Sequence, residues 1–222
     1  MVYVPEGVFL MGSIHNAKEP QHKVYLDAFW IDQTEVTNAR YKRCVDAGAC
    51  LPPSNSRSAT RDRYHSSPEF DDYPVVYVDW HRADTYCRWA DKRLPTEAEW
   101  EKAARGTDQR TYPWGEDPGC QYANYANCIG DTTMVGSYPS GASPYGCLDM
   151  AGNVIEWVSD WYDHDTYAHS PHRNPQGPDS GTTRITRGGS WLKGDIQCVF
   201  RNPVIPASND FFGFRCVSSG VF

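Results

Sequence analysis

Glycine and proline are spread through the whole chain, and this distribution constrains the fold more than any other feature. The 222 residues include 18 glycines and 16 prolines, which neither pool in one region nor follow a repeat of fixed period. Because both residues interrupt helices and strands, regular elements must be short and the loops between them long. The segments 51–74 and 163–183 are polar, contain prolines and exceed an ordinary connection. We therefore expect little regular secondary structure.

Three short helices are expected within these limits. The first spans roughly residues 37–47, where Thr37 can cap its start. The second follows Asp79 and carries apolar residues at helical spacing. The third spans roughly 96–105 and begins with a Thr-x-x-Glu capping box at Thr96.

Strands are expected where β-branched and aromatic residues cluster. The segments that meet this criterion are 2–4, 8–11, 24–31, 185–191 and 212–217. Helices in the first half and loops in the second are typical of an α+β fold. Aromatic residues make up 14% of the chain and can bury a large area, so we expect one folded domain over residues 1–222.

Charge and hydropathy exclude two classes of partner. The chain has 21 Lys and Arg against 28 Asp and Glu, which gives a net charge of −7 and argues against nucleic-acid binding. No run of apolar residues approaches the length of a membrane span. The start of the chain resembles a strand rather than a secretory signal, so we expect a mature protein or a piece of a longer one.

Eight cysteines without a Cys-x-x-Cys pair indicate disulfides rather than a zinc site. Spacing alone pairs Cys44 with Cys50 and Cys120 with Cys128. A disulfide framework favours an extracytoplasmic or cell-surface location.

Seven motifs occur in order along the chain and together carry a resemblance to a known family. They are Phe9-Leu10-Met11-Gly12, Asp32-Gln33-Thr34-Glu35-Val36-Thr37-Asn38, Arg93-Leu94-Pro95-Thr96-Glu97-Ala98-Glu99-Trp100-Glu101, Tyr112-Pro113-Trp114-Gly115, Asp149-Met150-Ala151-Gly152-Asn153-Val154-Ile155-Glu156-Trp157, Arg187-Gly188-Gly189-Ser190-Trp191 and Gly213-Phe214-Arg215. Over about residues 2–218 the chain closely resembles the formylglycine-generating enzyme family, also called the sulfatase-modifying factor domain. The resemblance implies a C-type-lectin-like variant fold with long loops, bound calcium and a groove on one face.

The activity of that family is oxidation of a cysteine in a Cys-x-Pro-x-Arg segment of a sulfatase to formylglycine, using oxygen and copper. A pair of thiolates five residues apart holds the soft Cu(I) ion shortly after the Arg-Gly-Gly-Ser motif. The corresponding segment here contains only Cys198, which aligns better with a structural disulfide position of the family. Lys193 cannot replace a thiolate. Copper is therefore not expected, and Cys198 and Ser190 are catalytic candidates only for an oxidase with different chemistry.

Two further features follow from the resemblance and from the cysteines it leaves over. The resemblance pairs Cys87 with Cys216. Cys147 and Cys198 then remain, and they either bridge each other or stay as buried free thiols. Ser190 matches a groove residue of the family, although its hydroxyl can equally satisfy the turn that follows the two glycines.

Calcium is expected at two positions, mainly because the resemblance implies it. The first set consists of Asp149 and Glu156 by side chain and of Gly152 and Val154 by carbonyl, within a bent segment that can supply several oxygens. The alternative role of these carboxylates is to cap backbone amides in a tight turn. The second set consists of Asn124, the carbonyl of Tyr125 and, as the nearest acidic residue, Asp131.

The histidines and carboxylates of 163–172 could suggest an iron site, but their spacing lacks helical register and a solvated loop is the expected outcome. The segment that follows Trp191 is the ligand face of C-type-lectin-like folds. It mixes apolar, aromatic and charged side chains, which is more typical of a binding surface than of an acid–base site. The candidate ligand-binding residues are Trp191, Leu192, Lys193, Asp195, Gln197, Phe200, Asn202, Asn209 and Phe211. At least one of Phe200, Ile205 and Phe212 should fill core instead.

The sequence thus favours a non-catalytic module that binds a protein or glycan ligand through a face near 191–212. Some proteins of this fold are variable proteins, in which diversity-generating retroelements mutate adenines of this segment, and the lost catalytic loop is compatible with that role. The alternative is an oxidase related to formylglycine-generating enzyme that acts on a protein cysteine or another substrate. An accessory domain of a larger polypeptide is a further possibility.

Overall fold

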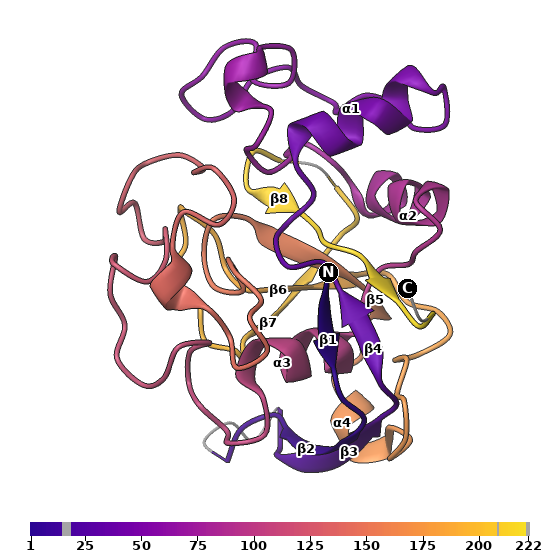
Figure 1. Ribbon diagram of the computed structural model, residues 1–222. Helices are drawn as coiled ribbons and strands as arrows, with labels where there is room; N and C mark the ends of the chain where they lie inside the picture. Colours follow the sequence, from indigo (N-terminus) through magenta and orange to yellow (C-terminus); the bar gives the residue numbers. More distant parts are fainter. Residues whose placement is uncertain (15–18, 208, 221–222) are drawn as a thin grey trace.

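The computed structural model describes residues 1–14, 19–207 and 209–220 of the chain. It consists of short helices and strands joined by long loops (Figure 1), which confirms the expected α+β, C-type-lectin-like architecture. The α-helices are α1 (Asn38–Asp46), α2 (Trp80–Trp89), α3 (Glu97–Arg105) and α4 (Thr166–His169), with 3-10 turns at Pro68–Phe70 and Pro139–Gly141. The strands are β1 (Val2–Val4), β2 (Gly7–Met11), β3 (His22–Leu26), β4 (Phe29–Ile31), β5 (Ile155–Trp161), β6 (Arg184–Arg187), β7 (Arg201–Val204), β8 (Phe212–Gly213) and β9 (Val217–Ser218).

The three expected helices form where their capping residues predict. Thr37 accepts a hydrogen bond from the amide of Arg40 at the start of α1, and Asp79 caps α2 in the same way. Thr96 and Glu99 make a complete capping box at the start of α3. These side chains satisfy amides that the first helical turn leaves without partners, so local sequence fixes where each helix begins.

The strands form three small sheets. In the first, β4 lies between β1 and β9, so the N-terminal and C-terminal strands meet in one sheet (Figure 1). The strands β2 and β3 make an antiparallel hairpin. The third sheet has the order β7-β6-β5-β8, in which β8 runs parallel to β5 and the other pairs are antiparallel.

Several strand predictions need correction. The segment 24–31 divides between β3 and β4, and 212–217 divides between β8 and β9. The strand expected at 185–191 ends at Arg187, because Gly188 and Gly189 adopt positive φ angles of 90° and 67°. The central strand β5 was not expected, since its buried carboxylates hide the apolar pattern of a strand, and β7 and α4 were not expected either.

Three disulfides hold the loops and the C-terminus. They join Cys44 to Cys50, Cys87 to Cys216 and Cys120 to Cys128, as expected. The alternative bridge between Cys147 and Cys198 was wrong, because both remain free thiols in the apolar core beside α3. None of the described helices is long and apolar enough to cross a membrane.

Candidate functional site

The segment that contains the predicted ligand face begins at a buried arginine. Arg187, at the end of β6, donates to the carboxylates of Glu101 at 2.6 Å and Glu97 at 3.1 Å, both on α3. The same guanidinium donates to the backbone carbonyl of Cys198 at 2.6 Å. These groups are all buried, so Arg187 ties the segment to α3 without access to solvent.

A second buried arginine holds the middle of the segment. Arg201 donates to both carboxylate oxygens of Glu97, at 2.7 and 2.8 Å. The next residue, Asn202, is half-buried in β7 and hydrogen-bonds with Thr186 of the neighbouring strand. Phe200, just before β7, is also half-buried. The predicted ligand residues Phe200 and Asn202 therefore belong to the edge of the sheet.

The residues directly after Ser190 form an exposed loop. Trp191 is buried, with its amide donating to the carbonyl of Asn153 at 2.9 Å. Leu192, Lys193 and Asp195 are exposed. Trp191 thus anchors the loop, and the next side chains are presented to solvent.

Two other loops lie beside this one. The amides of Ala126 and Asn127, within the disulfide loop 120–128, donate to the carbonyls of Lys193 at 3.2 Å and Trp191 at 2.7 Å. The indole of Trp191 reaches the carbonyl of Asp210 at 3.5 Å. We call residues 120–128, 191–195 and 209–211 the loop face.

The structure brings only part of the predicted ligand set together. Asn209 is exposed on the loop face, and its carbonyl accepts from the amide of Tyr77 at 2.8 Å. Phe211 is half-buried against Phe212, with ring centroids 4.9 Å apart, and Gln197 is half-buried. The sequence did not indicate that the disulfide loop 120–128 and Tyr77 would lie beside the predicted ligand residues. The cysteine spacing predicts the disulfide but not the segments against which its loop packs.

The two catalytic candidates of the oxidase alternative are both buried. Cys198 has no exposed surface, and burial raises the pKa of its thiol to about 12. The other free thiol, Cys147, has a pKa raised by burial to about 11. Ser190 is equally buried, and its hydroxyl has no hydrogen-bond partner among the described residues. A thiol that stays protonated and out of reach of solvent is a poor nucleophile and a poor copper ligand.

The first predicted calcium set has other partners. Both oxygens of Glu156 accept from the guanidinium of Arg215, at 2.7 and 2.6 Å, and one also accepts from the indole of Trp100. Asp149 accepts from the amide of Gly136 at 2.6 Å. An arginine in contact with Glu156 occupies and neutralises the charge that calcium would need, so this arrangement does not fit the ion. Gly152 and Val154, the two predicted carbonyl ligands, lie in the segment between these carboxylates.

The second predicted set is closer to a cation site. The amide group of Asn124 donates to the carbonyl of Asp131 at 2.7 Å, and its side-chain oxygen is buried without a hydrogen-bond partner among the described residues. Tyr125 follows directly and is half-buried. The carboxylate of Asp131 already accepts from Ser58 and Thr60, and these bonds help to lower its pKa.

No cluster of three or more His, Cys, Asp or Glu side chains able to hold a metal ion occurs among residues 1–14, 19–207 and 209–220. The 163–172 segment is not a loop throughout: His164 and Asp165 pair at its exposed start, and α4 follows, with Tyr167 buried in the core.

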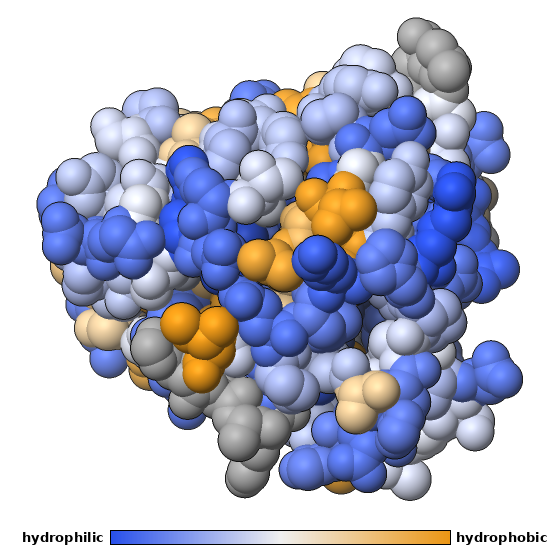
Figure 2. Space-filling model, turned by 90° about the horizontal axis from the view of Figure 1, so that it is seen from below, coloured by the Kyte–Doolittle hydropathy of each residue, from blue (hydrophilic) through white to orange (hydrophobic). Residues whose placement is uncertain are grey.

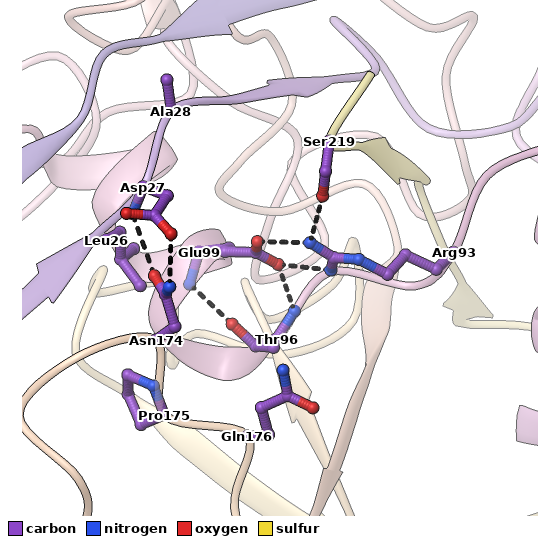
Figure 3. A pocket seen from close by; sticks show the side chains of 10 residues that line it. All are labelled: Leu26, Asp27, Ala28, Arg93, Thr96, Glu99, Asn174, Pro175, Gln176 and Ser219. Carbon is purple, nitrogen blue, oxygen red and sulfur yellow. Dashed lines mark hydrogen bonds and ion pairs between the residues drawn. The ribbon is translucent and has the colours of Figure 1, made fainter.

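A polar pocket of about 360 Å³ lies away from the loop face, between the turn that joins β3 to β4 and the start of α3 (Figure 3). Its polar groups already have partners: Arg93 makes two bonds to Glu99, and Asp27 accepts from Asn174 and pairs with Arg173 outside the pocket. Seen from below, the molecule exposes mainly hydrophilic residues with separate apolar spots (Figure 2).

Comparison with known proteins places this geometry in context. The model of the sulfatase-modifying factor enzyme 1-like domain matches residues 1–219. The formylglycine-generating enzyme of Streptomyces coelicolor is 34% identical, with 98% of this chain and 88% of the relative covered. The serine/threonine-protein kinase pkn1 of Chlamydia caviae is 40% identical over 97% of this chain. The chain spans only 37% of the length of that kinase.

Solved structures share the fold. Treponema denticola variable protein 1 superimposes with a TM-score of 0.82 at 24% identity, covering 99% of this chain and 95% of the other. PvdO from Pseudomonas aeruginosa superimposes with a TM-score of 0.80 at 27% identity, covering 97% and 92%.

Proposed function

Because this chain belongs to the sulfatase-modifying factor enzyme 1-like family, we propose that it is a member without the catalytic chemistry, which binds a protein or glycan ligand through the loop face. The observation that carries the proposal is the state of Cys198. The segment that should hold two thiolates contains this one cysteine, and its thiol is buried, protonated at neutral pH and packed in the core. The exposed side chains of the same segment are free to contact a partner.

The loop face has the composition of a binding surface. Leu192 supplies exposed apolar area, and Lys193 and Asp195 supply one charge of each sign beside it. Backbone hydrogen bonds to a disulfide-closed loop hold these residues in place. A preorganised loop loses less conformational entropy on binding, which favours affinity.

An oxidase with altered chemistry is the second candidate. Its support is the 34% identity to the Streptomyces coelicolor enzyme over most of both chains, together with 32% identity to the hercynine oxygenase of Mycolicibacterium smegmatis over 95% of this chain and 59% of that protein. An oxidase of this kind would need a reactive group other than a buried thiol.

The deciding experiment is incubation of the protein with a Cys-x-Pro-x-Arg peptide, copper and oxygen, followed by mass spectrometry of the peptide. A family enzyme with two catalytic cysteines is the positive control. We expect no formylglycine, and conversion of the peptide would establish the oxidase. A Cys198→Ala variant tests the same point from the other side, since activity that survives the change would exclude this thiol as the reactive group.

The binding role is tested by probing immobilised protein with a glycan array and a peptide display library, beside a Leu192→Ala/Lys193→Ala/Asp195→Ala variant. We expect a ligand that the wild type retains and the variant loses. A ligand that both proteins retain equally would place the binding site elsewhere.

Three wider proposals rest on the same face. Diversification by a retroelement would substitute exposed residues such as Leu192 and Asn209 and spare buried ones such as Ile196 and Arg201, which sequencing of related gene copies can test. This chain covers only 37% of the length of the kinase relative, which supports the proposal that it is a domain of a larger polypeptide. The three disulfides support an extracytoplasmic or cell-surface location.

We also propose calcium at Asn124 with the carbonyl of Tyr125, because a buried amide oxygen without a hydrogen donor is suited to a cation. Melting curves with calcium, magnesium or EGTA test the proposal. Calcium at a hundredfold excess over its dissociation constant would stabilise the protein by about 2.7 kcal/mol. We expect Asn124→Ala to abolish the calcium-dependent shift, and a shift that persists in this variant would contradict the assignment.

A further inference from the structure

An open pocket of about 520 Å³ lies beside the first half of α1. Its lining includes Arg40 and Arg43 on α1 and, from other parts of the chain, Asp72, Met134 and Val135. None of its described lining residues belongs to the loop face. The two arginines also lie outside the family motifs, so neither the scaffold nor the proposed function explains them.

Main-chain hydrogen bonds hold together the three segments that carry these side chains. The amide of Ala39, in the first turn of α1, donates to the carbonyl of Asp71 at 3.0 Å. The amide of Val135 donates to the carbonyl of Asp72 at 3.0 Å. The pocket therefore forms without a ligand. Both arginines are exposed, so a molecule from solution can reach them.

Neither arginine has a side-chain partner within the described part of the chain. Arg40 and Arg43 make no ion pair there, although Asp72 lines the same pocket. Apart from Arg63, every other described arginine makes at least one side-chain hydrogen bond. A protein with a net charge of −7 thus leaves two adjacent arginines unpaired at one pocket.

The positions of these arginines are unfavourable for the helix itself. Arg40 and Arg43 are three residues apart on α1 and are therefore neighbours on its surface, where like charges repel each other. Arg40 also lies in the first turn, beside the positive end of the helix dipole, and this turn contains no acidic residue. A negatively charged group in the pocket would relieve both repulsions.

We propose that this pocket binds a phosphate monoester whose organic part rests on Met134 and Val135. A phosphate group has three acceptor oxygens outside the ester bond, so it can accept from both guanidiniums at once. A carboxylate has only two oxygens, and one forked guanidinium already occupies them. Met134 is 47% exposed and supplies apolar area beside the charges. The charge pairs form at the surface, so binding does not depend on the exclusion of water.

The test compares hexyl phosphate with 1-hexanol, which has the same chain and no charge. In protein labelled at its methionine methyl groups, the chemical shift of Met134 reports binding at this pocket. Exposed charge pairs are individually weak, so we expect millimolar binding of hexyl phosphate, about tenfold tighter than that of hexanol. Raising the salt from about 50 to about 500 mM should weaken only the binding of hexyl phosphate. Equal affinities, or no shift of Met134 with hexyl phosphate, would overturn the proposal.

A double variant shows whether the two arginines supply the preference for phosphate. Arg40→Gln/Arg43→Gln removes side chains without partners in the described residues, so it should fold with an unchanged or slightly higher melting temperature. It should bind hexyl phosphate no more tightly than hexanol.

The matched control is Arg63→Gln. Arg63 is exposed, has no side-chain partner among the described residues and does not line the pocket, so this variant should retain the preference of about tenfold. A preference that survives in the double variant, or that the control also loses, would overturn the assignment to this pocket.

Two further titrations test the choice of phosphate and identify its source. Hexanoate carries a carboxylate on a similar chain and should bind more weakly than hexyl phosphate, and equal or tighter binding would contradict the choice of phosphate. A phosphoserine peptide with leucine on either side carries the phosphate on a protein segment. Tighter binding of this peptide than of hexyl phosphate would indicate a phosphorylated partner protein, and weaker binding would indicate a small phosphate ester.

Discussion

The charged residues of the core and those of the loop face occupy the same C-terminal stretch and have opposite environments. In the core, Arg215 makes two bonds to Glu156 and has no exposed surface. On the loop face, Lys193 and Asp195 are exposed, and neither makes an ion pair within the described residues. The arginines of the family motifs therefore build the scaffold, and the residues between the motifs are available for a partner.

The difference explains how the fold can hold while the loop residues change. Arg187 and Arg201 connect β6 and β7 to Glu97 on α3, and none of these contacts involves the loop face. Removing or replacing exposed loop residues leaves these bonds intact. The scaffold can therefore carry different surfaces, provided that the buried ion pairs remain.

The largest expected effect comes from breaking a buried pair. In Arg215→Met, the carboxylate of Glu156 loses its guanidinium and keeps only the indole of Trp100 as a partner. An unpaired buried charge costs about 3–5 kcal/mol. Urea unfolding followed by tryptophan fluorescence measures the loss.

The matched control is Arg88→Met on α2, where the arginine side chain is 74% exposed and pairs with Asp84. An exposed pair of this kind contributes less than about 1 kcal/mol. Similar losses of stability in Arg215→Met and Arg88→Met would mean that burial does not determine how much an ion pair contributes.

Substitution of Gly189, which lies just before the loop face, should give the next largest loss of stability. Gly189 has a φ of +67°, and a Cβ atom there would lie 2.6 Å from the carbonyl oxygen of Asp195. Gly189→Ala combines backbone strain with this overlap, and we expect a loss of about 2–4 kcal/mol in thermal or urea unfolding. Gly146→Ala has a similar φ of +85° and no atom within 4 Å of its Cβ.

The Gly146→Ala control should therefore show strain alone, about 1–2 kcal/mol. The difference in unfolding free energy between the two variants measures the cost of the steric overlap between residue 189 and the backbone of Asp195. If both lose the same amount, the loop moves aside without cost and the loop face is not preorganised.

Much of this fold could be predicted from the sequence, and the parts that could not have physical reasons. Thr37, Asp79 and Thr96 marked the helix starts because capping is a local interaction. The strand β5 was missed because Glu156 and Asp160 are buried within it. Their partners, the guanidinium of Arg215 and the amide of Glu97, lie far away in the sequence.

The candidate site was predicted less completely than the fold. The sequence located the segment after Trp191 but not which of its residues face solvent. Arg201 is buried and Asn202 is half-buried because of how β7 packs in three dimensions. Nothing local indicated that the disulfide loop would donate two amides to this segment. Which of the two alternatives holds for Cys198, a bridge to Cys147 or a buried thiol, also depends on packing, because the sequence is compatible with both.

A buried carboxyl without an arginine gives a pH-dependent comparison. Asp160 accepts from the amide of Glu97 at 2.8 Å, and burial together with repulsion from the Glu97 carboxylate raises its pKa to about 7. In the unfolded chain its pKa is about 4, so the folded state binds more protons between about pH 4 and 7. Stability should fall across this window as the pH rises, by up to about 1.4 kcal/mol per pH unit.

Asp160→Asn retains the acceptor for the Glu97 amide and cannot ionise. Its stability relative to wild type should therefore increase steadily from about pH 4 to pH 7 and change little below pH 4, in urea unfolding at each pH. Asp179→Asn, at an exposed position, is the control and should show no such trend. A constant difference between Asp160→Asn and wild type would mean that Asp160 is ionised throughout.

The smallest expected effect on stability is at the loop face itself. Truncation of Leu192, Lys193 and Asp195 together to alanine removes only exposed side chains, so unfolding free energy should stay within about 0.5 kcal/mol of wild type for each position. Ile196→Ala, one residue further along, truncates a side chain that is only 1% exposed and should cost about 2–5 kcal/mol. A large loss in the triple variant would show that these residues support the fold, and the loop face would then no longer be a surface that can change independently of its scaffold.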